Sequence, residues 1–219
     1  MNENLIQGQV ALLELGDLFG TSRDQPDSAQ LRITSALLRC VSRWGLSKTT
    51  IEDLAKEAGV SRATVYRLFP GGKNAIMRAA VLGEVRSLLA VLTVELAQVD
   101  QVEDCLTVAL HRSAQFLDQH QALCFMRDHE SAVLDQLLSS EQLDLLFVTA
   151  AQVMKPVLGR FMDEAAAIKV GMWVARLVVS YVAEPSAEFD LCKEQDCSRL
   201  VRMFVLPGIS TASLTRPHT

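Results

Sequence analysis

The sequence predicts an all-α protein, and three observations support this fold class. Gly and Pro are sparse, with 11 and 6 among 219 residues, so few breaks interrupt the chain. Long stretches of Ala, Leu, Val, Glu and Gln recur at helical spacing, while strand-like runs bounded by turn residues are missing. Hydrophobic residues make up 49% of the chain but aromatic residues only 5%. The core must therefore consist mostly of Leu, Val, Ala and Met.

The first 28 residues are expected to form an N-terminal extension that is partly helical. Apolar residues between Met1 and Gly20 fit an amphipathic helix, and Gly20–Ser28 has the composition of a loop. The next helix is predicted over Ala29–Trp44, because its apolar residues fall on one face and Gly45 follows its last turn.

Two short helices separated by one glycine come next. We expect Thr49 to open the first with a capping box whose reciprocal partner is Glu52. Gly59 can adopt a positive φ angle without strain, so it supplies the turn. Ser61 then caps the second helix, Arg62–Phe69. Helices this short are marginal in water, so they must pack on each other and on a third helix, as in a helix-turn-helix.

The remaining chain is predicted to be a helical body followed by a disordered tail. Its helices are expected at Lys73–Gln98, Val102–Gln119, Leu123–Ser139, Ser140–Asp163, Glu164–Ala183 and Asp196–Leu206. The predicted domains are the extension (1–28), a helix-turn-helix domain (29–76), a domain for effector binding and dimerisation (77–206) and the tail (207–219).

Charge is distributed unevenly along the chain. Ser28–Leu82 holds nine Lys and Arg but three acidic residues, a net charge of +6, whereas the remainder carries −11, for a total of −5. A basic module on an acidic body suggests a polyanion partner for the module alone. Double-stranded DNA is the expected partner.

The outward side of the second short helix carries side chains that suit DNA. Arg suits guanine edges, and Thr and Ala can contact a thymine methyl group. Ser, Tyr and Lys suit phosphates, and Ser61 and Lys73 also open helices, where backbone amides favour anions. The alternative is a plain helical hairpin with a solvated basic face. The expected contacts are Ser61, Arg62, Ala63, Thr64, Tyr66, Arg67 and Lys73.

Residues Ile33–Met77, above all the run TTIEDLAKEAGVSRATVYRLFPGGKNAIM, closely resemble the DNA-binding domain of the TetR family of bacterial transcriptional regulators. Leu54 replaces a usual Ile, and Pro70-Gly71-Gly72 replaces a more polar turn. The resemblance implies a homodimeric repressor of a palindromic operator, whose C-terminal domain binds a small effector. It also implies DNA contacts at Thr50, Ser61, Arg62, Thr64, Tyr66 and Lys73.

The segment Ala165–Ala183 is apolar almost all round, and such a helix must be buried on every side. A partner subunit could supply the second wall together with Asp196–Leu206, because two-fold DNA sites need paired recognition helices about 34–36 Å apart. The alternative is a helix at the centre of a monomer. The expected interface residues are Met172, Val174, Val178, Tyr181, Leu200, Val201 and Phe204.

A small apolar effector, acyl or sterol-like, is expected to bind in the body beside the long helix that starts at Lys73. Ordinary core packing is the alternative interpretation of each residue in that region. A second alternative is a DNA-binding factor without an effector, regulated by a protein partner or by the redox state of cysteines such as Cys192 and Cys197. The expected pocket residues are Phe116, Phe125, Met126, His129, Phe147, Met154 and Trp173.

Several other classes of protein are not expected. Motifs such as G-x-S-x-G, a phosphate loop or H-E-x-x-H are missing, so the chain is not predicted to be an enzyme, and no catalytic residue, cofactor or metal is expected. Lys169 and Arg176 argue against a membrane span in the most apolar stretch. No basic residue precedes Arg23, and the five cysteines are an odd number, so we expect a cytoplasmic protein.

Overall fold

A computed structural model describes residues 28–138 and 141–209, and these residues contain helices and no strand. The all-α fold class is thereby confirmed. The chain divides into two compact units. The N-terminal unit comprises residues 28–87 and 119–138 of the described chain, and the body unit comprises residues 88–118 and 141–209. The predicted extension and most of the predicted tail lie outside the described residues, although residues 206–209 are helical.

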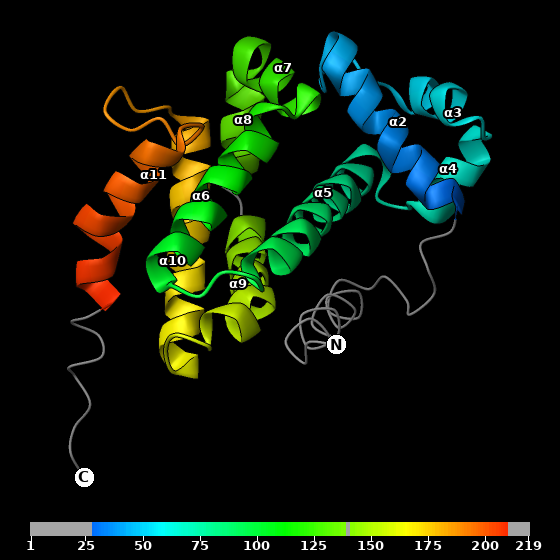
Figure 1. The fold of residues 1–219 in the computed structure, drawn as a ribbon. Helices are drawn as coiled ribbons and strands as arrows, with labels where there is room; N and C mark the ends of the chain where they lie inside the picture. Colours follow the sequence, from blue (N-terminus) through cyan, green and yellow to red (C-terminus); the bar gives the residue numbers. More distant parts are fainter. Residues whose placement is uncertain (1–27, 139–140, 210–219) are drawn as a thin grey trace. The chain divides into compact units, whose positions relative to one another are not determined.

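The helices follow the predicted order, with small differences at their ends (Figure 1). One predicted helix, Leu123–Ser139, is in fact two, because the chain breaks at Glu130. The last predicted helix ends in a π-helical turn, η1. The elements are α2 (Ser28–Trp44), α3 (Ile51–Ala58), α4 (Arg62–Leu68), α5 (Gly72–Leu96), α6 (Val102–Asp118), α7 (Gln121–His129), α8 (Ser131–Leu138), α9 (Glu141–Leu158), α10 (Glu164–Ala183), α11 (Glu194–Leu200) and η1 (Val201–Val205).

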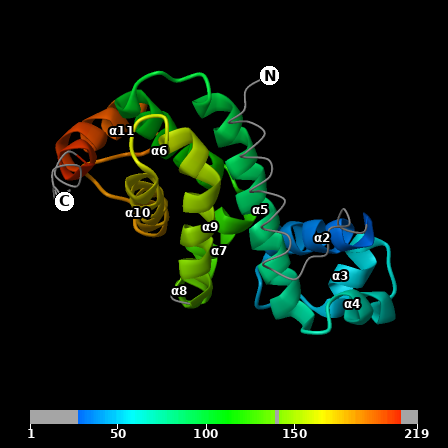
Figure 2. The same cartoon turned by 90° about the horizontal axis from the view of Figure 1, so that it is seen from below.

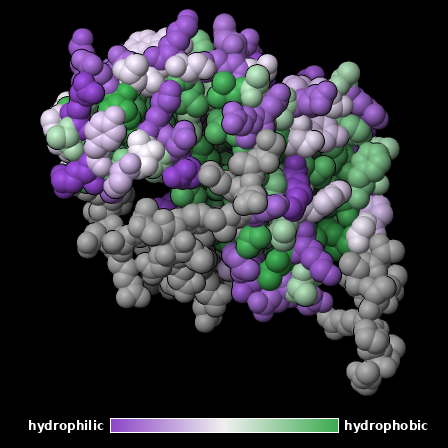
Figure 3. All heavy atoms as spheres, turned by 180° about the vertical axis from the view of Figure 1, so that it is seen from behind, coloured by the Kyte–Doolittle hydropathy of each residue, from purple (hydrophilic) through white to green (hydrophobic). Residues whose placement is uncertain are grey.

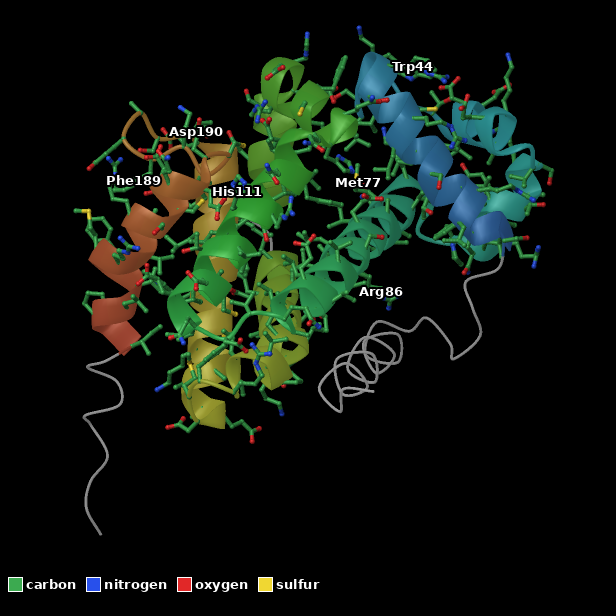
Figure 4. All side chains as sticks on the ribbon, viewed as in Figure 1. Trp44, Met77, Arg86, His111, Phe189 and Asp190 are labelled. Atoms are coloured by element: carbon green, nitrogen blue, oxygen red, sulfur yellow. The ribbon has the colours of Figure 1, made fainter. Side chains whose placement is uncertain are left out.

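The N-terminal unit is built on α2, α3, α4 and the first part of α5, which lie together in both ribbon views (Figures 1 and 2). Its core is apolar and continuous, and Figure 4 labels two of its side chains, Trp44 on α2 and Met77 on α5. The fully buried members include Ile33, Leu37, Leu54, Val65 and Ile76.

Helices α7 and α8 also belong to the N-terminal unit, although they follow α6 in the sequence. Helix α7 packs against α2. Ala122 and Met126 of α7, and Leu134 of α8, are buried in the same core as the α2–α5 side chains. The unit therefore differs from the predicted domain of residues 29–76: it extends along α5 to Ser87 and takes in the α7–α8 segment.

The body unit consists of the end of α5 with α6, α9, α10, α11 and η1. Helix α10 packs against both α9 and α6, and α11 packs against α6. His111 of α6 faces the loop before α11, where its Nδ1 lies 3.1 Å from the Leu191 carbonyl oxygen; Figure 4 labels His111 with the loop residues Phe189 and Asp190. The loop is thus fastened to α6.

One chain buries the residues of the predicted dimer interface to different degrees. Four of its expected residues are buried within one chain, at 9% exposure for Val174, 5% for Val178, 2% for Leu200 and 0% for Val201. Helices α9 and α6 cover part of α10, while its Trp173 stays 41% exposed. Met172 and Tyr181 are half-buried, and Phe204 is 54% exposed.

Candidate nucleic-acid interface

Helix α4 is fixed at its start and along its inner side. The Ser61 side chain caps it: Oγ accepts from the Thr64 amide at 3.0 Å and shares a 2.9 Å hydrogen bond with Thr64 Oγ1. Val65, fully buried, and Phe69, at 7% exposure, anchor the inner side in the core. Gly59 joins α3 to α4 at φ +66°, which a residue with a Cβ adopts only with strain.

The outer side of α4 presents the predicted DNA contacts to solvent. Ser61, Arg62, Ala63, Tyr66 and Arg67 are all exposed, and Thr64 is half-buried. Tyr66 leaves 49% of its surface in water. Within the described residues, neither Tyr66 nor Arg67 has a side-chain hydrogen bond or ion pair. Both side chains can therefore turn to an external partner.

Arg62 is held only weakly. Its guanidinium lies 3.6 Å from the Glu52 carboxylate, and the two side chains are 62% and 76% exposed. An ion pair this exposed contributes about 0–1 kcal/mol. A phosphate or a guanine edge can replace it at little cost.

The capping box of α3 is one residue later than predicted. Thr50, not Thr49, is the N-cap, and its partner is Asp53, not Glu52. Hydrogen bonds from the Thr50 hydroxyl and amide lower the pKa of the Asp53 carboxyl. Thr49 is buried and donates to the Gly45 carbonyl at 2.7 Å instead. The exposed Thr50 thus keeps its predicted place on the surface, but its hydroxyl is already engaged.

Lys73 is placed differently from the free, phosphate-facing side chain that we expected. Its half-buried ammonium group donates to the carbonyl oxygens of Leu46 at 2.9 Å and Thr49 at 3.1 Å. Because an ammonium group has three protons, one remains for a phosphate. Lys73 also has the structural task of tying α5 to the α2–α3 turn, which its motif position does not reveal.

Two other basic side chains of the N-terminal unit form ion pairs within it. Arg39 and Arg43 of α2 both bind Glu57 of α3, at 2.6 and 3.2 Å. The hydrogen bond from Arg39 is the main reason that the pKa of Glu57 is lowered. This pair of contacts holds α2 against α3, so the angle at which α3 carries α4 is reinforced.

The predicted effector residues divide between the two units. Met126 is 7% exposed and belongs to the N-terminal core, while Phe125 stacks on His129 with ring centroids 4.5 Å apart in the same unit. Of these three residues, only Met126 is part of the core; Phe125 is half-buried and His129 is exposed. The members in the body unit are Phe116 (half-buried), Phe147 (9% exposed), Met154 (8%) and Trp173 (41%).

A groove of about 480 Å³ lies elsewhere in the body unit, on the outer side of α11. None of the predicted pocket residues is part of this groove. The lining residues are Glu194, Gln195, Ser198, Arg199, Arg202 and Met203.

Two kinds of site are absent from the described residues. They contain no group of three or more His, Cys, Asp or Glu side chains that could hold a metal ion. No described helix is both long enough and apolar enough to cross a membrane.

Comparison with known proteins agrees with this geometry. Residues 33–80 match the family described as "Bacterial regulatory proteins, tetR family". An uncharacterized HTH-type transcriptional regulator of Mycobacterium bovis is 33% identical over 72 residues, which are 33% of this chain and 37% of that protein. The chain therefore matches little more than a third of this relative's length.

Two solved structures share the fold. The TetR family repressor AlkX from Dietzia sp. Strain DQ12-45-1b is 21% identical, with a TM-score of 0.67, and the match covers 86% of this chain and 98% of that one. The fatty acid degradation regulator FadR from Bacillus halodurans is 15% identical, with a TM-score of 0.55, over 80% and 98% of the two chains.

The tandem α3–α4 pair on α2, with an exposed polar face on α4, defines the helix-turn-helix class. Over residues 33–80 the chain is similar to the TetR family of bacterial regulatory proteins, and this part has that family's helix-turn-helix. The members of this family are transcriptional regulators, which agrees with the prediction that the chain is not an enzyme.

Proposed function

We propose that the chain is a dimeric transcriptional regulator, acting as a repressor in the cytoplasm, that binds a palindromic DNA operator through α4. The observation that carries this proposal is the outer side of α4, where Tyr66 and Arg67 stand exposed without a partner in the described chain. In this arrangement Arg62, Thr64 and Arg67 contact base edges, while Ser61, Tyr66 and the third proton of Lys73 contact phosphates.

Selection from random duplex DNA tests the proposal. Two-fold related α4 helices should enrich an inverted repeat whose half-sites lie about one helical turn apart. Binding should weaken steeply with salt, because each phosphate contact adds about 0.9 to the slope of log affinity against log salt. Failure to enrich any sequence, together with salt-independent binding, would reject DNA binding.

The proposed dimer interface uses the apolar side chains that one chain leaves exposed at α10 and η1. Trp173 is 41% exposed, Met203 53% and Phe204 54%. Figure 3 shows one face of the molecule, on which apolar side chains reach the surface between hydrophilic ones. Exposed aromatic side chains and Met are enriched at the centres of interfaces, so these three residues support association better than the buried α10 residues do.

The proposed effector is a long-chain apolar compound bound within the body unit. AlkX is implicated in biodegradation of n-alkanes and FadR is a fatty acid degradation regulator, so two proteins with this fold concern compounds with hydrocarbon chains. Thr107 of α6 supports a site inside the unit. It is 5% exposed, and its hydroxyl has no hydrogen-bond partner in the described structure. Buried hydroxyls nearly always have a partner, so Thr107 suits the polar end of such a ligand.

Thermal shift with fatty acids, acyl-CoA esters, n-alkanes and sterols tests the effector. One of these classes should raise the melting temperature, and if that class has a polar end, as fatty acids, acyl-CoA esters and sterols do, Thr107→Val should reduce the shift. Thr93→Val is the control, because the buried Thr93 hydroxyl already donates to the Leu89 carbonyl at 2.7 Å. Equal shifts in both variants would mean that the ligand binds elsewhere. No shift with any class would favour the alternative of a DNA-binding factor that has no effector and is regulated by a protein partner.

Regulation by cysteine redox state is the less favoured alternative. Burial, with nearby Cys192 and acidic groups, raises the pKa of the Cys197 thiol to about 12. A thiol with so high a pKa stays protonated at neutral pH and reacts slowly with oxidants, since the thiolate is the reactive form.

A further inference from the structure

The turn between α2 and α3, residues 45–49, is held from two sides by charged side chains. On one side, the amides of Leu46 and Ser47 donate to the two Glu130 carboxylate oxygens, at 2.6 and 3.0 Å. On the other side, the Lys73 ammonium group donates to the Leu46 and Thr49 carbonyl oxygens. Both backbone donors and backbone acceptors of this short turn are therefore bound by side chains distant in sequence.

Glu130 is itself rigidly placed. Its amide donates to the Met126 carbonyl at 2.8 Å and ends α7, while its carbonyl accepts from the amides of Val133 at 2.9 Å and Leu134 at 3.1 Å at the start of α8. Met126 and Leu134 are buried in the N-terminal core. The carboxylate thus extends from a backbone that two packed helices fix.

Helix α7 is also fastened at its other end. His120 Nδ1 accepts from the Leu123 amide at 3.2 Å, so a neutral His120 carries its proton on Nε2. That Nε2 lies 3.4 Å from the Glu84 carboxylate on α5. Helix α7 is therefore attached to α5 at its start and to the α2–α3 turn at its end, all within the N-terminal unit.

Gly45 allows the carboxylate to approach this closely. Its φ angle is +89°, and a Cβ built on it would lie 2.6–2.8 Å from the Glu130 carboxylate atoms. Such distances do not occur between real atoms of this kind. The glycine and the carboxylate thus form one arrangement, in which a side chain at position 45 would displace Glu130.

The turn matters for DNA because it leads directly into α3. It ends at Thr49 and Thr50, the latter being the N-cap of α3 and an exposed residue. Helix α3 in turn carries α4, through Gly59 and their shared core. A shift of the turn would therefore move the helix pair that reads DNA.

We propose that Glu130 is a positioning residue for DNA recognition, which holds the α2–α3 turn and makes the α7–α8 segment part of the DNA-reading unit. This inference rests on the proposed DNA-binding function. It assigns to the middle of the chain a role that the helix-turn-helix motif of residues 33–80 does not contain.

The test compares Glu130→Gln with Asp128→Asn, a matched loss of one negative charge from an exposed residue of α7. Electrostatics alone should strengthen DNA binding in both variants, because each loses a charge that repels phosphates. Positioning predicts the opposite sign for Glu130→Gln: roughly tenfold weaker binding to the selected duplex, with non-specific binding retained. Equal or tighter binding by Glu130→Gln, as for Asp128→Asn, would overturn the positioning role.

Amide hydrogen exchange tests the Glu130 contact without DNA. Leu46 and Ser47 amides should exchange at least about tenfold faster in Glu130→Gln than in the wild type, and at the wild-type rate in Asp128→Asn. Unchanged exchange in Glu130→Gln would overturn the contact itself. If the wild type selected no DNA, the proposed function would fail, while exchange would still decide whether Glu130 holds the turn. Should Glu130→Gln not fold, Glu130→Asp, which keeps the charge but is too short to reach both amides, should give the same exchange result.

Discussion

The two units of this chain differ in what fixes their helices. In the N-terminal unit, charged and polar side chains bind the backbone of neighbouring elements, as Glu130 and Lys73 do at the α2–α3 turn. In the body unit, α10 packs on α9 and α6 with buried apolar side chains such as Val174 and Val178, and its ion pairs with α9 are formed by more exposed side chains. Polar contacts define one geometry, whereas apolar contacts tolerate rearrangement more readily. The N-terminal unit, which is proposed to present side chains to DNA at fixed positions, is thus the one held by directional hydrogen bonds from side chains to backbone.

Helix α5 is common to both units and is fastened by a cation in each. Lys73 binds carbonyls of the α2–α3 turn near its start. At its end, Arg160 donates to the carbonyl oxygens of Leu96, Ala97 and Val99. A basic side chain at a helix C-terminus satisfies carbonyls that lack partners within the helix. The end of α5 is therefore where the body unit most resembles the N-terminal unit.

The largest expected effect tests the apolar enclosure of α10. Val178→Asp places a charge at a site that is 5% exposed, and should destabilise the body unit by several kcal/mol in urea unfolding, since the charge has no partner there. Phe204→Asp, at a site that is 54% exposed, loses the ring contact with Phe189 but should destabilise the unit far less, and it should shift the proposed dimer to monomer in ultracentrifugation. Leu31→Asp, at 52% exposure on α2, is the control and should stay dimeric. A stable Val178→Asp protein would contradict the enclosure.

Three glycine substitutions test the backbone geometry that the hydrogen bonds of the N-terminal unit require. Gly45→Ala should cost roughly 1–3 kcal/mol for its positive φ, and more because it displaces Glu130. Gly59→Ala, where nothing lies within 4 Å of the added Cβ, should cost only the backbone part. Gly83→Ala in α5 meets no atom and no positive φ, so it should stabilise by about 1 kcal/mol. Chemical denaturation would give the order, and equal effects at positions 45 and 59 would argue against the Glu130 contact.

The two fastenings of α5 can be compared directly. Lys73→Met and Arg160→Met each remove a cation from backbone carbonyls, and each should destabilise its own unit by about 1–3 kcal/mol. Single-tryptophan variants separate the units: Trp44 reports on the N-terminal unit and Trp173 on the body unit. If Lys73→Met altered only the Trp173 signal, the assignment of Lys73 to the α2–α3 turn would be wrong.

Acidification should lower the stability of the N-terminal unit more than that of the body unit, an effect smaller than those of the substitutions above. Burial alone would raise the pKa of the Glu130 carboxyl. Hydrogen bonds from Ser47 and Leu46, together with the nearby Lys73, outweigh burial and hold that pKa below its usual 4.5. Asp53 and Glu57 also have lowered pKa values, and all three carboxylates belong to the N-terminal unit. A lowered pKa contributes stability that is complete above the unfolded value and is lost as the pH falls through the folded one. Between pH 6 and pH 3 the unfolding transition reported by Trp44 should therefore move to a lower denaturant concentration. The move should be smaller in Glu130→Gln, which lacks one of these carboxylates.

Features specified by neighbouring residues could be predicted from the sequence. The limits of α10, the Ser61 cap and the αL turn at Gly59 all depend on side chains within a few positions, and the structure has them where the sequence predicts them. The exposed outer side of α4 follows from the same local pattern.

Features that depend on distant contacts could not be predicted. Thr49 and Thr50 are each followed three residues later by an acid, so the capping box has two local solutions, and the buried contact from Thr49 to Gly45 selects the second. The pairing of Glu130 with Leu46 spans 84 positions and has no local signal. Met126 carries the same apolar signature whether it lines a pocket or fills a core, and only packing shows that it belongs to the N-terminal core.

The most direct test of DNA recognition by α4 is the affinity of three proteins for the selected duplex: wild type, Arg67→Ala and Lys169→Ala. Arg67 and Lys169 are both exposed cations, one on α4 and the other on α10, so the variants lose the same charge. Recognition through α4 predicts that Arg67→Ala loses about 1–3 kcal/mol of binding free energy while Lys169→Ala stays near the wild type. Equal losses in the two variants, or no loss in Arg67→Ala, would contradict it.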